Sequence, residues 1–103
     1  MIGPKPRGHW SQHLSEVDCG HAYKHLEAGA RYTVVQEFTD FDGDIHPPGE
    51  TWAFLGYAFV PHDDGLSLFV ALTPTDEWHI RLRLDDPASI ASQIETFVKT
   101  VPS

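Results

Sequence analysis

Apolar positions recur at every second residue in four segments of the middle of the chain, and this is the period of a β-strand. The pattern predicts strands over residues 31–39, 51–60, 66–72 and 78–84. β-branched and aromatic residues dominate these segments, as strands favour. The segment 51–60 has apolar residues on both faces, which is typical of a strand covered on both sides or bent around a barrel. Gly56 within it indicates a bulge or a sharp bend.

Helical spacing is confined to the two ends of the chain. Apolar residues at i, i+4 and i+7 predict a two-turn helix over residues 9–17, and residues 21–26 predict one further helical turn. Asp86 suits a helix N-cap and Pro87 the first helical position, so the apolar stripe that follows predicts a helix from Pro87 to about Lys99. Residues 1–8 hold two prolines and two glycines, which favours a flexible arm.

Short turns join most of the predicted strands, so the fold class is mainly β. We expect an antiparallel meander of four to five strands, or an SH3-like small barrel, with a C-terminal α-helix and a short N-terminal helical segment. The domain organisation that follows is an N-terminal arm with a short helix over residues 1–22 and a single barrel-like domain over residues 23–103.

Composition limits the classes of function. The 103 residues carry 7 basic and 15 acidic side chains, a net charge of −8. This balance argues against a nucleic-acid partner and against docking on an anionic membrane, because both need a basic surface. One cysteine excludes an intramolecular disulfide. The first residues lack the apolar stretch of a signal peptide, so we expect a cytoplasmic protein.

A long ordered pattern of residues also runs through the chain. Its members are Tyr23-Lys24-His25-Leu26, Gly29, Tyr32-Thr33-Val34-Val35, Phe38-Thr39-Asp40, Pro48-Gly49-Glu50-Thr51-Trp52, Phe54-Leu55-Gly56, Asp64-Gly65-Leu66-Ser67-Leu68-Phe69-Val70 and Trp78-His79-Ile80-Arg81-Leu82. This pattern resembles a small bacterial family of domains of unknown function over roughly residues 23–97. The resemblance implies a bacterial origin and no particular activity. The looser likeness to SH3-like barrels is one of fold alone.

The candidate binding residues lie in the acidic loop after residue 39 and on the neighbouring strands. Asp40, Asp42 and Asp44 match the first three ligand positions of an EF-hand, but Ile45 and Thr51 stand where that loop needs glycine and glutamate, so we interpret the segment as a solvated turn. Aromatic side chains outnumber the positions that one face of a small sheet can hide, and exposed aromatics usually mark an interface. The predicted binding set is Asp40, Asp42, Asp44, His46, Glu50, Trp52, Tyr57, Arg81 and Arg83.

A second cluster has the chemistry of a metal site. Histidines four residues apart would share one face of a helix, and imidazole and thiolate groups are good ligands for Zn²⁺. The candidate ligands are His9, His13, Cys19, His21 and His25. Neither a zincin motif nor a Cys-x-x-Cys pair accompanies them, so surface histidines are the competing interpretation. Recognised motifs for nucleophilic catalysis or for phosphate binding are also absent from the sequence.

The function predicted from these features is a non-enzymatic, acidic protein-binding module. Its partner would be a protein, and a basic one is favoured by charge complementarity, as when an immunity protein neutralises a toxin. The alternative is a small metal-binding protein or metal-dependent enzyme that uses the N-terminal histidines and Cys19. A homodimer formed through a sheet edge or exposed aromatics is compatible with the first hypothesis.

The metal hypothesis can be tested by native mass spectrometry of the untagged chain purified without chelator. A bound Zn²⁺ ion would appear as a stoichiometric mass adduct that EDTA removes, with a fall in melting temperature because the metal stabilises the folded state. The binding-module hypothesis expects the bare mass. A stoichiometric adduct that disappears on mutation of His21 and His25 would instead favour the metal site.

Overall fold

The computed structural model of the chain describes residues 2–9, 19–60, 65–83 and 93–101, without the side chains of residues 19, 59, 60 and 83. Most of the strand residues that the structure describes belong to one antiparallel sheet. Its strands lie in the order β1 (Ile2–Pro6), β10 (Asp76–Arg83), β9 (Gly65–Ala71), β8 (Thr51–Val60), β5 (Arg31–Val34) and β11 (Val98–Thr100), and β2 (Cys19–Gly20) also pairs with β8.

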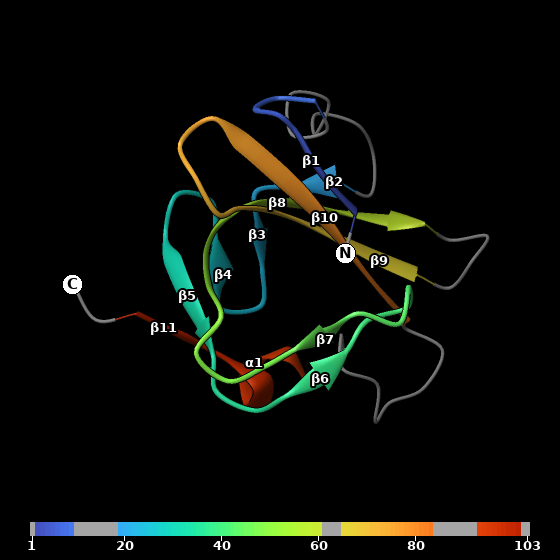
Figure 1. Cartoon of the computed structure of the whole chain (residues 1–103), viewed down its shortest axis with the longest axis vertical. Helices are drawn as coiled ribbons and strands as arrows, with labels where there is room; N and C mark the ends of the chain where they lie inside the picture. The colour runs from blue at the N-terminus through green and yellow to red at the C-terminus, as the bar shows by residue number, and fades with distance from the viewer. Residues whose placement is uncertain (1, 10–18, 61–64, 84–92, 102–103) are drawn as a thin grey trace.

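Two short hairpins and one helical turn complete the fold. β3 (Ala22–Tyr23) pairs with β4 (Leu26–Glu27), and β6 (Phe38–Thr39) pairs with β7 (Ile45–His46). The helix α1 spans Ile94–Phe97. Figure 1 shows the long strands β8, β9 and β10 side by side across one half of the molecule, with the β6–β7 hairpin and α1 in the other half. The β6–β7 hairpin therefore lies across from most of the central sheet, and its turn reaches β10, where Phe41 donates its N–H to the carbonyl of Arg81 at 2.8 Å.

The central meander follows the alternation of the sequence. β8, β9 and β10 are consecutive antiparallel neighbours, as predicted, and β8 covers the predicted residues 51–60. The register between β8 and β9 shifts between Phe54 and Gly56, which confirms the irregularity predicted at this glycine. Mainly β structure in antiparallel sheets is therefore confirmed.

The core lies between the curved sheet and the segments that cross its inner face. Its members are the buried apolar residues Leu26, Tyr32, Val34, Phe38, Trp52, Phe54, Leu66, Leu68, Val70, Ile80, Leu82, Ile94 and Val98. They come from both hairpins, α1 and most of the sheet. Burying such side chains is the main favourable term in folding, at about 25 cal/mol per Å² of apolar surface. The residues between them in β9, Ser67, Phe69 and Ala71, are buried as well, so this strand is covered on both faces.

The sheet does not close into a barrel within the described residues, because β1 and β11 are its two ends and do not pair with each other. The SH3-like barrel, one of the two expected arrangements, is therefore not confirmed. The predicted flexible arm is also corrected, since residues 2–6 form β1 and pair with β10. β2 likewise ties residues 19 and 20 to β8. Both strands fall inside the segment 1–22 that was predicted to be an arm.

Both helical predictions that the structure describes need correction. Residues 21–26 form a hairpin whose turn places Lys24 at φ 52°, the left-handed region, instead of a helical turn. The C-terminal helix covers only Ile94–Phe97 among the described residues, and Val98–Thr100 continue as a strand beside β5. The predicted stripe at Ile94 and Val98 is buried as expected, but a β-branched segment satisfies the same burial as a strand. The helix predicted for residues 9–17 lies almost entirely outside the described residues.

The other predicted strand, residues 31–39, is interrupted. β5 ends at Val34 and β6 begins at Phe38, and Val35 donates its backbone N–H to the carbonyl of Phe97 at 2.8 Å. The break turns the chain away from the main sheet and starts the β6–β7 hairpin. None of the helices in the described ranges is long and apolar enough to span a membrane.

Leucine truncations along β9 test where the core ends. Leu68 has 0% exposure, whereas Leu72, which the alternation also predicted on the inner face, lies beyond the strand and is 39% exposed. We expect Leu68→Ala to lower the free energy of unfolding by about 3 kcal/mol through lost burial and a residual cavity. The matched Leu72→Ala should cost less than about 1 kcal/mol. Urea unfolding measures both, and equal losses would contradict the described end of the core.

Candidate functional site

The β6–β7 hairpin is shaped by Asp40, the first residue of its turn. One carboxylate oxygen of Asp40, Oδ1, accepts the backbone N–H groups of Asp42 and Asp44, both at 3.0 Å. Gly43 completes the turn at φ 88°, a conformation that favours glycine, and donates its N–H to the carbonyl of Asp40. Aspartate followed by such a turn is a local signal in the sequence, because its side chain can bond to backbone groups ahead of it.

A buried histidine joins this turn to the start of β8. Nε2 of His46 lies 2.8 Å from Oδ2 of Asp40, and Nδ1 lies 2.6 Å from Oε2 of Glu50. The side chains of His46 and Asp40 have 1% and 0% exposure. We call Asp40, His46 and Glu50 the histidine network. It connects residues on either side of β7 through one ring, which fixes the loop between β6 and β8.

The surroundings of the ring complete its packing. The ring of Phe38 stacks on His46, with centroids 4.6 Å apart and planes 15° from parallel. The indole N–H of Trp52 donates to Glu50 at 3.3 Å. Trp52 is fully buried in the core. Four members of the predicted binding set are thus brought together by the fold: Asp40, His46, Glu50 and Trp52. Their positions suit them to hold the loop rather than to touch a partner.

Electrostatics in the network favour the charged forms of its members. Burial alone would lower the pKa of His46, but hydrogen bonds and attraction from Glu50 and Asp40 outweigh it and raise this pKa above its ordinary value. Burial alone would raise the pKa of Asp40, yet the hydrogen bonds it accepts, including those from His46 and the Asp44 amide, lower that pKa. The raised pKa of His46 and the lowered pKa of Asp40 both favour an imidazolium that lies between two carboxylates.

On the outside of the turn, Arg81 of β10 holds the hairpin from a second direction. Its guanidinium donates to both carboxylate oxygens of Asp42, through Nε at 3.1 Å and through Nη2. It also lies over the ring of Phe41, 5.1 Å from the centroid. The backbone carbonyl of Arg81 accepts the N–H of Phe41 at 2.8 Å. The hydrogen bonds from Arg81 lower the pKa of Asp42. A partly exposed ion pair of this kind adds little stability but fixes the orientation of the turn.

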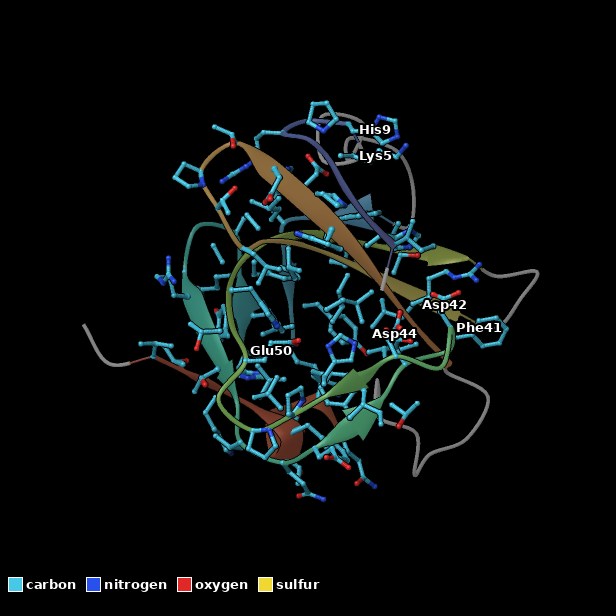
Figure 2. The ribbon with its side chains drawn as sticks, viewed as in Figure 1. Lys5, His9, Phe41, Asp42, Asp44 and Glu50 are labelled. Carbon is cyan, nitrogen blue, oxygen red and sulfur yellow. The ribbon has the colours of Figure 1, made fainter. Side chains whose placement is uncertain are left out.

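The outward side chains of the turn are apolar or acidic. Phe41 is 54% exposed and Ile45 is 61% exposed, the two largest values among the large exposed hydrophobic residues in the described part of the chain. Asp42 and Asp44 are exposed beside them. We call residues 41–45 the hairpin tip. Figure 2 shows Phe41, Asp42 and Asp44 together at the turn, with Glu50 toward the interior of the molecule.

The remaining predicted binding residues lie apart from the histidine network, or their side chains are not described by the structure. Tyr57 packs against the ring of Tyr23, with centroids 5.5 Å apart. The side chain of Arg83 is not among those described. His79 lies two residues before Arg81 on β10 and is half-buried against Phe69, with ring centroids 5.0 Å apart. Burial and the nearby charge of Arg81 lower the pKa of His79 to about 4.

The predicted metal ligands do not form the expected helical pairs where the structure describes them. His21 precedes β3 and His25 lies in the turn between β3 and β4, so they do not share a helix face. Nε2 of His25 lies 2.7 Å from the carbonyl oxygen of Val98. His9 is exposed beyond the end of β1, and the positions of His13 and of the Cys19 side chain are outside the description. Within the described ranges, no three histidine, cysteine or acidic side chains are placed to hold a metal ion.

Sequence reasoning missed the two residues that dominate the exposed tip, Phe41 and Ile45. Their signal was present: two large apolar residues interrupt a run of aspartates and glycine. An apolar residue in a polar turn has no predicted core to join, so it is expected to be exposed. No comparable local signal in the sequence predicts that the side chain of His46 faces the interior, because this depends on the pairing of His46 with Phe38.

Replacement of the central histidine tests the structural role of the network. His46→Gln removes the charge that separates two carboxylates, and breaking a buried ion pair typically costs about 3–5 kcal/mol. We expect chemical denaturation near pH 6 to show a loss of about 3 kcal/mol. His21→Gln, at an exposed position, should change stability by less than about 0.5 kcal/mol. If the two variants unfold at the same denaturant concentration, the network does not hold the loop.

Comparison with known proteins relates this chain to a solved structure of similar fold. No protein-family model matches the sequence, and no curated protein matches it. A solved structure of an integron cassette protein from the mobile metagenome of Vibrio cholerae is similar, with a TM-score of 0.73 and 29% sequence identity. The match covers 88% of this chain and 97% of the cassette protein. The chain is thus similar over nearly its whole length to a protein encoded by a mobile gene cassette.

Proposed function

We propose that this chain is a non-enzymatic, acidic protein-binding module of the bacterial cytoplasm, and that the hairpin tip is its contact surface for a basic protein. The exposure of Phe41 and Ile45 on a turn held from two sides carries this proposal. Interfaces gain most of their affinity from a few large apolar or aromatic anchors. A turn that is already ordered loses little conformational entropy on binding, which favours affinity.

Charge supports a basic partner. The chain has a net charge of −8, and the apolar tip is accompanied by the exposed carboxylates Asp42 and Asp44. Complementary charge speeds encounter and suppresses wrong partners. The carboxylate of Asp42 is oriented by Arg81, and the backbone N–H of Asp44 is held by Asp40, so both acidic residues have defined positions on the tip.

The ends of the sheet are poorly suited to strand addition, which favours the tip over the edges. β1 contains Pro4 and Pro6, which have no backbone N–H to donate. In β11, Val98 donates its N–H to the carbonyl of Ile94, and its own carbonyl is contacted by His25. A partner is therefore expected to bind through side chains of the tip rather than by extending the sheet.

The proposal is tested by quantitative affinity capture from bacterial lysate. We compare the wild-type chain, the double variant Phe41→Ser/Ile45→Ser, and the matched control Val35→Ser/Leu72→Ser, which removes two exposed apolar side chains elsewhere. We expect a basic protein that binds the wild type and the control equally and the tip variant at least about tenfold more weakly, since one anchor residue contributes about 1–2 kcal/mol or more.

Charge is tested with the captured protein in the same format. Asp44→Lys should weaken binding, and the effect should shrink as salt rises, because exposed charges are screened over about 8 Å at physiological ionic strength. Glu27→Lys makes the same charge change on the β3–β4 hairpin and serves as the control. Equal capture by wild type and the tip variant, at every salt concentration, would contradict the proposed surface.

A further inference from the structure

Both ring nitrogens of His46 face groups that accept hydrogen bonds when ionised. Nδ1 lies 2.6 Å from Glu50 Oε2, and Nε2 lies 2.8 Å from Asp40 Oδ2. A neutral imidazole has one N–H group and one lone pair, whereas the imidazolium has two N–H groups. The arrangement therefore requires both ring protons, since a neutral ring would oppose a lone pair to a carboxylate at one of the two contacts.

The two carboxylates differ in their access to water. The side chain of Asp40 has 0% exposure, and its second oxygen also accepts the amides of Asp42 and Asp44. Glu50 retains 18% exposure, and its further partner is the indole N–H of Trp52. Turning Asp40 outward would break its contact with His46 and its hydrogen bonds with two backbone amides, whereas turning Glu50 outward gives up the His46 contact and the bond from the Trp52 indole. Nδ1, which faces Glu50, is thus the nitrogen from which the proton is expected to leave.

The other contacts of the ring cannot replace that proton. Among the described residues, the charged side chains that contact His46 are Asp40, which follows β6, and Glu50, which precedes β8. Phe38 of β6 stacks on the ring without a charge. Once the ring is neutral, the attraction that holds Glu50 to it is lost, and the short contact to Nδ1 becomes repulsive.

We propose that Glu50 is a pH-operated latch on the binding loop. Loss of the Nδ1 proton of His46 releases Glu50 from the ring and from Trp52, and it frees the segment between β7 and β8 from its tie to the hairpin. The tip then loses one of its two supports and binds its partner more weakly. This inference rests on the proposed function, because the hairpin tip is the surface that the latch controls.

The sign of the pH dependence follows from the folded state. Because the pKa of His46 is raised on folding, its stabilisation is complete below the ordinary value of about 6.5 and is lost as pH rises through the raised value. The pKa of Asp40 is lowered, so its contribution is kept above its ordinary value of about 3.9 and is lost as pH falls through the lowered one. The latch is closed between these limits and opens on the alkaline side.

An NMR titration of the full chain labelled with ¹⁵N tests the latch without a partner. We expect the His46 ring nitrogens to report an imidazolium near pH 6 and the Nε2–H tautomer at high pH. The Trp52 indole N–H and the Gly49 amide should shift with the same midpoint. A Trp52 signal that stays fixed while His46 titrates, or a ring that keeps its proton on Nδ1, would overturn the proposal.

Two variants sharpen the result. Glu50→Gln removes the charge that Nδ1 faces and should lower the His46 midpoint by about one pH unit, a tenfold loss of proton affinity. His21→Gln should leave the midpoint unchanged.

Binding of the captured partner tests the effect of the latch on the tip. Wild-type affinity for this partner should fall at least threefold across the His46 midpoint, and an unchanged affinity would overturn the proposal that the latch controls binding. Tip variants that bind like wild type would instead contradict the proposed function, while the titration judges the latch separately.

Discussion

A charged histidine held between two carboxylates is the interaction on which the loop between β6 and β8 depends. Burying an ion is costly, and this cost is offset only when every hydrogen-bonding position of the buried group is matched. His46 meets that condition with Asp40 on one side and Glu50 on the other. Because the three residues belong to separate segments, the ring selects one arrangement of the loop. Apolar packing alone would allow several, since it is not directional.

The same network determines what the loop presents. Asp40 uses one oxygen on His46 and the other on the amides of the turn, so the outer shape of the tip is set from the inside. The alternation of side chains along the two strands then determines which residues of the hairpin face outward. Phe38 pairs with His46 on the buried face, and the next pair, Thr39 with Ile45, therefore faces outward. The exposed apolar anchor at Ile45 is thus a geometric consequence of the buried histidine one residue later.

The sequence predicted correctly those elements whose apolar residues repeat with a regular local period. The meander of β8, β9 and β10 and the irregularity at Gly56 follow from alternation over many residues. The short strands β1, β2 and β11 were missed because two to five residues carry too little pattern, and their pairing is decided by distant partners. The acidic loop was identified as a candidate site, but alternation does not reveal which of its polar residues turn inward. His46 looks no different from an exposed histidine until its strand register is known.

If the proposed function holds, the outer strands explain why a partner would be recognised by side chains. Prolines in β1 and the capped backbone groups of Val98 leave few donors and acceptors for strand addition, which also guards a small acidic protein against edge-to-edge aggregation. Specificity must then come from shape and charge. A tip with two apolar anchors and flanking carboxylates supplies both, but only while it is rigid. Rigidity in turn depends on the buried ring of His46, and of its two carboxylate partners Glu50 is partly exposed whereas Asp40 is not, so Glu50 is the group through which we propose that the tip is regulated.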